Sequence, residues 1–168
     1  MWQEAKCEWE DIYFMFNKIN VNYNGIVKNE QIIIGYLSKH SDNFSLTVVI
    51  RKPYSQDPPI FKYSEQLTPY ATKFIFDRKD WPVDFLGQLK HQIMMIGRCC
   101  KESRKELLKM PNLFSTLEYD VPEDICFYRN GKLWFATVTH EKMAFMLNPT
   151  KQDLEFLEEH QIDYYNEG

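Results

Sequence analysis

Glycine is scarce in this sequence, with 6 residues among 168. The chain contains neither GxGxxG nor GxxxxGK followed by Ser or Thr, the loops that hold the phosphates of dinucleotides and nucleoside triphosphates. It also lacks a DxDxDG calcium loop and a GxSxG nucleophile elbow. We therefore expect no nucleotide-dependent chemistry, no calcium site and no cofactor.

Cysteine is also sparse, and its spacing is unsuitable for a metal site. The 4 cysteines include the adjacent pair Cys99 and Cys100, and no CxxC occurs. Disulfide frameworks and zinc sites need regularly spaced cysteines. We therefore expect reduced, mostly buried thiols, no bound metal and a cytoplasmic location.

Long apolar runs are missing. The longest purely aliphatic run is Ile32–Ile34, whereas a membrane-spanning helix needs roughly 20 apolar residues. The first ten residues, MWQEAKCEWE, contain acids and no apolar core, so they do not form a signal peptide. The sequence predicts no membrane partner.

Basic residues are fewer than acidic residues, 20 against 24, and they are unevenly distributed along the chain. The net charge is −4, so we expect no nucleic-acid partner, because phosphate binding needs clustered positive charge. From residue 118 onward, 11 acidic and 4 basic residues give −7, and the preceding 117 residues, with 13 acidic and 16 basic, give +3. An acidic C-terminal part can steer a basic partner, although a solvated helix surface gives the same pattern.

Apolar side chains at helical spacing predict three helices. The first runs from Trp2 to about Asn17–Asn20, and the second from about Asp80 to Lys109. The third follows Thr150, with Asp153 placed to complete a capping box.

Apolar and β-branched runs predict five to seven strands. The main ones are residues 31–37, 44–52, 72–78, 125–129, 132–139 and 142–147. Asn24-Gly25 and Asn130-Gly131 are strong turn signals, and residues 53–71 form a long loop rich in proline and tyrosine. Because the connections between paired strands are short, the sheet should be mainly antiparallel. We predict a single α+β domain over residues 1–168, with the helices largely on one face.

His140 and Glu141 are the first candidates for catalysis. A zinc protease signature needs a second histidine three residues after the glutamate, and the sequence HEKMA has Ala144 there. A polar turn is the favoured interpretation. The remaining catalytic hypothesis is that His140 acts as a general base oriented by Glu141 or Glu123, near a pocket that also includes Cys126.

Two features of the predicted central helix are further candidates. His91 and Cys99 would lie about 12 Å apart along the axis, too far for proton transfer, so we expect Cys99 and Cys100 to be packing residues, with Cys100 on the core face. The segment Arg98–Lys109 is locally basic and could grip phosphate, but interleaved glutamates favour a solvated helix face.

The remaining signal is the presence of aromatic residues in segments that are expected to lie on the surface. Aromatic residues on polar segments are typical of interfaces, although they can equally fold back onto the core. The predicted binding residues are Tyr54, Phe61, Tyr63, Tyr70, His140, Glu158, Glu159, Tyr164 and Tyr165.

The leading hypothesis is a non-enzymatic protein that binds another protein, with a basic partner. In broad outline the chain is similar to small acidic bacterial immunity proteins, which neutralise toxins by covering basic, nucleic-acid-binding sites. No motif carries that resemblance. The alternatives are a small-molecule-binding domain or hydrolase-type enzyme that uses His140 and Glu141, and a self-associating structural protein whose aromatic loop forms a dimer contact.

Overall fold

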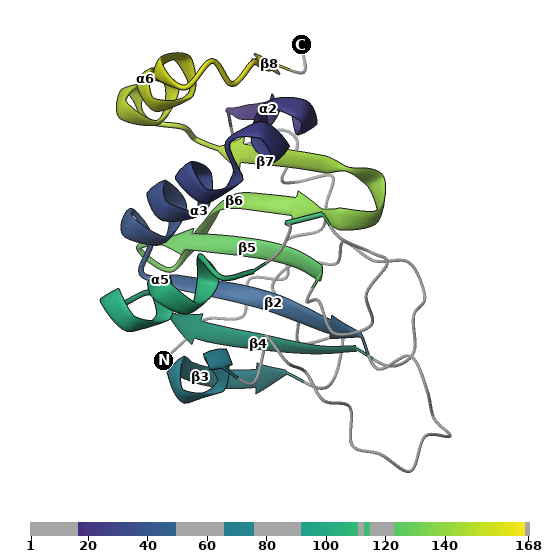
Figure 1. The fold of residues 1–168 in the computed structure, drawn as a ribbon, viewed down its shortest axis with the longest axis vertical. Helices are drawn as coiled ribbons and strands as arrows, with labels where there is room; N and C mark the ends of the chain where they lie inside the picture. The colour runs from purple at the N-terminus through teal and green to yellow at the C-terminus, as the bar shows by residue number, and fades with distance from the viewer. Residues whose placement is uncertain (1–16, 50–65, 76–91, 111–112, 115–122, 167–168) are drawn as a thin grey trace.

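The architecture is a single antiparallel sheet with helices packed against it (Figure 1). A computed structural model describes residues 17–49, 66–75, 92–110, 113–114 and 123–166. In this part of the chain the sheet has eight strands in the order β3-β4-β2-β5-β6-β7-β1-β8. The α+β class and the antiparallel pairing are confirmed, but the sheet exceeds the predicted five to seven strands.

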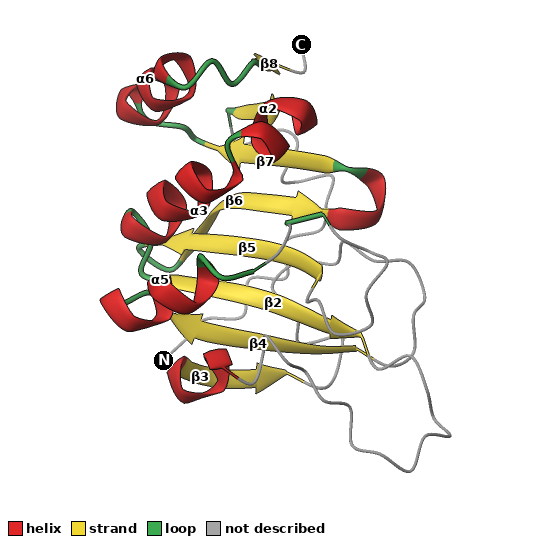
Figure 2. Cartoon of the chain, in the orientation of Figure 1, coloured by secondary structure: helices red, strands yellow, loops and turns green. Residues whose placement is uncertain are grey.

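The strands, which Figure 2 shows in yellow, follow one another along the chain with helices between them. The strands are β1 Lys18–Val21, β2 Asn43–Val49, β3 Ala71–Ile75, β4 Gln92–Arg98, β5 Glu123–Arg129, β6 Lys132–Val138, β7 Met143–Leu147 and β8 Tyr164–Asn166. The α-helices are α2 Tyr23–Lys28, α3 Glu30–Lys39, α5 Lys101–Leu107 and α6 Lys151–Glu159, and the 3-10 turns are η1 Thr68–Tyr70 and η3 Thr139–Glu141.

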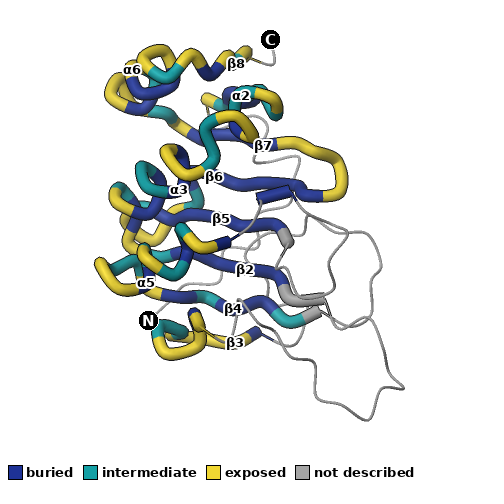
Figure 3. The backbone as a smooth tube through the Cα atoms, in the orientation of Figure 1, coloured by how far each residue is buried: buried dark blue, intermediate teal, exposed yellow. Residues whose placement is uncertain are grey.

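The main core lies between the sheet and these helices. Each of the four α-helices contributes buried side chains to it, for example Ile33 of α3 and Phe156 of α6. The opposite side of the sheet, called the second face here, carries a smaller cluster that includes Cys126, Tyr128 and Phe145. Figure 3 shows the central strands as almost continuously buried.

Several predictions that rest on local signals are confirmed. Strands β5, β6 and β7 match the three predicted C-terminal strands, and Asn130-Gly131 forms the tight turn between β5 and β6 with φ values of 52° and 72°. Thr150 caps α6, and Asp153 completes the capping box. Within the described residues, the strands predicted at 44–52 and 72–78 are also present as β2 and β3.

The prediction for residues 22–37 is wrong. Asn24-Gly25 does not form the predicted turn, because both residues lie inside α2. The Asn22 side chain accepts a hydrogen bond from the backbone N–H of Gly25 and caps this helix. The predicted strand 31–37 is helix α3, because Ile33, Ile34 and Leu37 fall on one side of a helix and are all buried.

The predicted long central helix is confirmed only in part where the structure describes it. Residues 92–98 form β4, a strand paired on both sides with β2 and β3, and only Lys101–Leu107 are helical. An apolar run covered on both faces does not show the alternation that would have marked it as a strand. Residues 80–91 lie outside the described part.

The first helix was predicted to reach Asn17–Asn20, but Lys18–Val21 form β1. Residues 2–16 of that prediction lie outside the described residues, as do residues 53–65 of the predicted loop. At the end of this loop, Leu67 is buried and Thr68–Tyr70 form η1. Strand β8 was not predicted.

Candidate functional site

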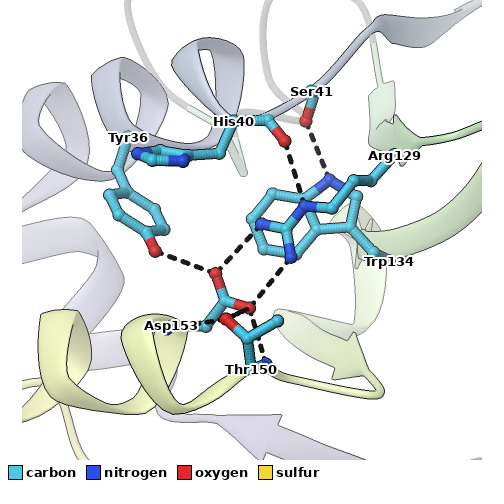
Figure 4. Close-up of polar contacts among 7 residues, drawn as sticks. All are labelled: Tyr36, His40, Ser41, Arg129, Trp134, Thr150 and Asp153. Carbon is cyan, nitrogen blue, oxygen red and sulfur yellow. Dashed lines mark hydrogen bonds and ion pairs between the residues drawn. The ribbon is translucent and has the colours of Figure 1, made fainter.

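Among the described residues, a dense group of polar contacts joins α3, α6 and the hairpin of β5 and β6 (Figure 4). We call this group the Asp153 cluster and define it as Tyr36, His40, Ser41, Arg129, Trp134, Thr150 and Asp153. Tyr36 belongs to α3, Arg129 ends β5, and Asp153 lies in the first turn of α6.

Asp153 is the centre of the cluster, and its side chain is 0% exposed. The Arg129 guanidinium donates two hydrogen bonds of 3.0 Å, one to each carboxylate oxygen. The Tyr36 hydroxyl donates to Oδ1 at 2.8 Å. The backbone N–H and the hydroxyl of Thr150 each donate to Oδ2 at 2.7 Å.

Arg129 is held from other directions as well. Its Nε donates to the backbone carbonyl of His40 at 3.1 Å, and its guanidinium stacks 3.7 Å above the ring of Trp134. Trp134 faces the cluster because the β5–β6 register shifts there, which places Trp134 and Phe135 on the same side of the sheet. The indole N–H then donates to the Ser41 hydroxyl at 2.8 Å.

The electrostatics of the cluster favour a fixed ion pair. Burial acts to raise the pKa of Asp153, but the hydrogen bonds from Arg129, Thr150 and Tyr36 outweigh it and lower that pKa below its ordinary value. Burial and the hydrogen bond to Asp153 raise the pKa of Tyr36. At neutral pH, Asp153 is therefore ionised and the Tyr36 hydroxyl stays protonated.

This arrangement leaves little capacity for chemistry. Both oxygens of Asp153 are fully engaged, the Tyr36 hydroxyl is a donor to them, and Arg129 uses three nitrogens in fixed hydrogen bonds. The cluster therefore joins three structural elements, and Asp153, Tyr36 and Arg129 supply no free base or nucleophile. We interpret it as a structural lock.

His140 and Glu141 lie on η3, away from this cluster. The His140 Nε2 and Glu141 Oε1 atoms are 3.6 Å apart, and the two side chains are 47% and 55% exposed. The side chain of Glu123, the other predicted orienting acid, lies outside the described part. An exposed pair at this distance is typical of a polar turn.

Cys126 does not join His140. It lies in β5 opposite Ala136 and is buried on the second face, where its thiol donates to the carbonyl of Asp124 at 3.5 Å. Burial raises the pKa of Cys126, which keeps the thiol protonated and unreactive. Among the described residues, the predicted catalytic group of His140, Glu141 and Cys126 is not assembled.

The predicted binding residues fall into separate regions. Tyr54, Phe61 and Tyr63 lie outside the described residues, and Tyr70 is partly buried beside β3. Glu158 and Glu159 are exposed on α6, and the Tyr164 hydroxyl donates to Glu158 at 3.0 Å. Because β3 and β8 are opposite ends of the strand order, Tyr70 is far from Tyr164 and Tyr165.

Cys100 differs from its prediction, because it does not sit on the core face of a helix. It is the N-cap of α5, and its sulfur accepts a hydrogen bond from the backbone N–H of Ser103 at 3.5 Å. This bond lowers the pKa of Cys100, whereas burial raises the pKa of Cys99 to about 12. The sequence signal was the position of Cys100 three residues before Ser103, a spacing typical of a capping box.

We expect Cys100 to be the most reactive of the described cysteines. At pH 7.5, iodoacetamide should modify Cys100 at least about ten-fold faster than Cys99 or Cys126, because the thiolate is the reactive species. Site-resolved mass spectrometry over a time course measures the three rates. Equal rates at Cys100 and Cys126 would show that the helix cap does not activate the thiol.

Sequence reasoning did not identify the Asp153 cluster. It found the capping box of Thr150 and Asp153, which is local, but not the partners Arg129 and Tyr36, which lie 24 and 117 residues from Asp153. The signal in the sequence was a carboxylate three residues after the helix cap Thr150. The spacing of Thr150 and Asp153 does not indicate which residue neutralises the Asp153 carboxylate.

Comparisons with known proteins give no relative: no family model, no curated protein and no solved structure matches the chain. In the part of the chain that the structure describes, no helix is long and apolar enough to cross a membrane. Within the same residues, no three His, Cys, Asp or Glu side chains gather as a metal site would require. Any functional assignment must therefore come from this chain's own surface.

Proposed function

We propose that this chain is a protein-binding protein with a basic partner, and that it binds through its C-terminal surface. We define this surface by α6 and β8, with the exposed or half-exposed residues Glu155, Glu158, Glu159, Asp163, Tyr164 and Tyr165. The observation that carries the proposal is uncompensated negative charge beside an exposed aromatic edge strand.

The charge of this surface is unbalanced. Lys151 pairs with Glu155 at 3.1 Å, which leaves Glu158, Glu159 and Asp163. One exposed lysine and four exposed acids give 1 − 4 = −3. Such a patch attracts a basic surface and speeds its diffusional approach.

Strand β8 supplies contact area next to this charge. Within the described chain it pairs with β1 and ends the strand order, so it is an edge strand. Alternate residues of a strand point to opposite sides; Tyr164 bonds to Glu158 on one side, and Tyr165, 59% exposed, lies on the other. A partner that approaches the edge contacts both. Exposed tyrosines are favoured anchors, and sheet edges accept partner strands.

The proposed binding surface is smaller than the one expected from the sequence. Tyr70 and His140 lie on η1 and η3, apart from the C-terminal surface, and contribute nothing to it. The form of binding that we favour is inhibition of a basic partner by covering its active surface, as small acidic immunity proteins do. The negative charge and the exposed Tyr165 support this form.

Removing the charge and the aromatic anchor together should abolish partner binding. We expect an E158Q/E159Q/Y165A variant to retain about ten-fold less of a basic partner than the wild type in affinity capture from the native cytoplasm, since each lost anchor weakens a complex several-fold. Quantitative mass spectrometry of the captured proteins measures the loss.

The matched control is E102Q/E141Q/M143A, which removes two exposed acids and one exposed apolar side chain from α5, η3 and β7. It should capture the same partner as the wild type. Equal retention by the C-terminal variant and the wild type, or capture of acidic partners alone, would contradict the proposal.

A further inference from the structure

The described sheet ends in two edge strands, β3 and β8, which Figure 1 shows at its opposite ends. Proteins protect sheet edges against pairing with another chain by lysines, prolines and bulges. Strand β3 carries the exposed Lys73, and its register with β4 shifts between Ala71 and Lys73. Strand β8 contains neither lysine nor proline, and its register with β1 is regular. Of these two edges, β8 is therefore the one that is open to a partner strand.

The hydrogen bonds between β1 and β8 show which backbone groups of β8 point outward. In an antiparallel pair, residues that exchange hydrogen bonds alternate with residues whose N–H and C=O groups point away from the partner strand. The Asn22 N–H donates to the Asp163 carbonyl at 2.8 Å, so these two residues are a bonded pair. Two residues further in the same register, Tyr165 belongs to the next bonded pair. The N–H and C=O groups of Tyr164 and Asn166 therefore point away from β1.

The pairing of β1 with β7 gives the same alternation. The Asn148 N–H donates to the Asn17 carbonyl at 2.7 Å, so Ile19 and Val21 are the next residues of β1 that bond to β7. Asn20 lies between them, and its backbone groups therefore point to β8. Because no strand follows β8 in the described strand order, the outward backbone groups of β8 are available to another chain.

The side chains of β8 present different chemistry on the two sides of the sheet. Tyr165 lies opposite Asn20, whose two neighbours in β1 point into the main core, so Tyr165 points to the second face. Tyr164 points to the helix side, where its hydroxyl donates to Glu158 of α6 at 3.0 Å. A strand added beside β8 would therefore have one row of side chains next to the acidic α6 and the other row next to the exposed ring of Tyr165.

We propose that an extended basic segment of the partner adds to the sheet as a further strand beside β8. This inference rests on the proposed function and specifies its mode of binding. The backbone of the segment bonds to Tyr164 and Asn166, its side chains that face α6 are basic, and those that face Tyr165 are apolar. Because β8 has only three residues, it offers few backbone bonds, and charge and the contact with Tyr165 supply the rest of the affinity.

The test is a titration of the full chain with a synthetic octapeptide in which lysine and valine alternate, observed through the NMR signals of the backbone amides. We expect saturable binding, with slower hydrogen exchange at the N–H groups of Tyr164 and Asn166. The Tyr165 N–H is already bonded to β1, so its exchange should slow less. An octapeptide of alternating lysine and proline has the same charge but cannot pair as a strand, and it should bind at least about ten-fold more weakly.

Asn166→Pro removes an outward N–H of β8 and leaves the bonds to β1 in place. It should weaken binding of the lysine–valine peptide about five-fold, the effect of one lost hydrogen bond. The matched control is Asn166→Ala, which removes the side chain, keeps the N–H and should bind as the wild type does. Wild-type affinity in Asn166→Pro, equal affinity for the two peptides, or no saturation up to about 1 mM peptide overturns strand addition.

Failure of strand addition and failure of the proposed function give different results. If the two peptides bind equally and E158Q/E159Q/Y165A loses the captured partner, the C-terminal surface binds through charge and the tyrosine ring, without an added strand. If E158Q/E159Q/Y165A keeps the partner, the proposed function is wrong and strand addition is overturned with it. Should Asn166→Pro fail to fold, the comparison of the two peptides and the amide exchange of Tyr164 still decide the matter.

Discussion

An Asp153→Asn variant is expected to lose about 3 kcal/mol of unfolding free energy. Asparagine cannot neutralise Arg129, whose side chain is only 25% exposed, and its amide presents donors where Arg129, Tyr36 and Thr150 already donate. Breaking one partner of a buried ion pair typically costs 3–5 kcal/mol, and the partial exposure of Arg129 places this case at about the lower end. Urea unfolding of both proteins at pH 7 measures the difference.

The matched control is Glu155→Gln on the same helix. Its pair with Lys151 is solvent-exposed, with side chains 90% and 59% accessible, so the change should stay within about 0.5 kcal/mol. A loss below about 1 kcal/mol for Asp153→Asn would contradict the interpretation of the cluster as a structural lock.

The difference in unfolding free energy between the wild type and Asp153→Asn should also depend on pH, in a direction set by the pKa of Asp153. The pKa of Asp153 is lowered on folding, so its contribution is fully present above its ordinary value of 3.8 and is lost as the pH falls through the lower, folded value. The stability gap between the wild type and Asp153→Asn should therefore be constant from pH 7 to about pH 5 and shrink below about pH 4.

Gly97→Ala should destabilise the protein by about 2–3 kcal/mol, the effect of overpacking a well-filled core. Gly97 lies in β4 opposite Phe44 of β2. A Cβ atom at residue 97 would fall 2.3 Å from the Phe44 ring, and all three of its nearest atoms belong to that ring. Phe44 is fully buried, so the ring cannot move away without displacing the core.

Gly35→Ala is the control, and it should change the unfolding free energy in the opposite direction. Nothing lies within 4 Å of a Cβ at this helical position. Alanine in a helix interior should stabilise the protein by about 0.5–1 kcal/mol. Thermal or urea unfolding of both variants measures the two effects. Equal and small effects at both sites would show that Phe44 does not pack over Gly97.

The comparison of α3 and β4 shows where sequence reasoning fails. The stretches QIIIGYL at 31–37 and QIMMIGR at 92–98 have the same length, and each has an apolar run between a glutamine and a glycine, yet the first is a helix and the second a strand. Periodicity alone cannot separate a short buried helix from a strand that is covered on both faces. The choice is made by tertiary contacts, including the fit of Phe44 over Gly97.

Local signals were sufficient at two other positions. The Asn130-Gly131 turn and the Thr150–Asp153 capping box each depend on residues within a few positions, and both were predicted. The same distinction between neighbouring and distant residues applies to the candidate sites. The exposed acids of α6 were identified from the sequence, whereas the pairing of Asp153 with Arg129 depends on the packing of distant elements.

Hydrogen–deuterium exchange on the complex with a captured basic partner tests the proposed function most directly. We expect slower exchange at the backbone amides of Tyr164–Asn166 and along the exposed side of α6, with little change at η1 and η3. Protection confined to η1 or η3, with β8 and α6 unaffected, would contradict binding through the C-terminal surface.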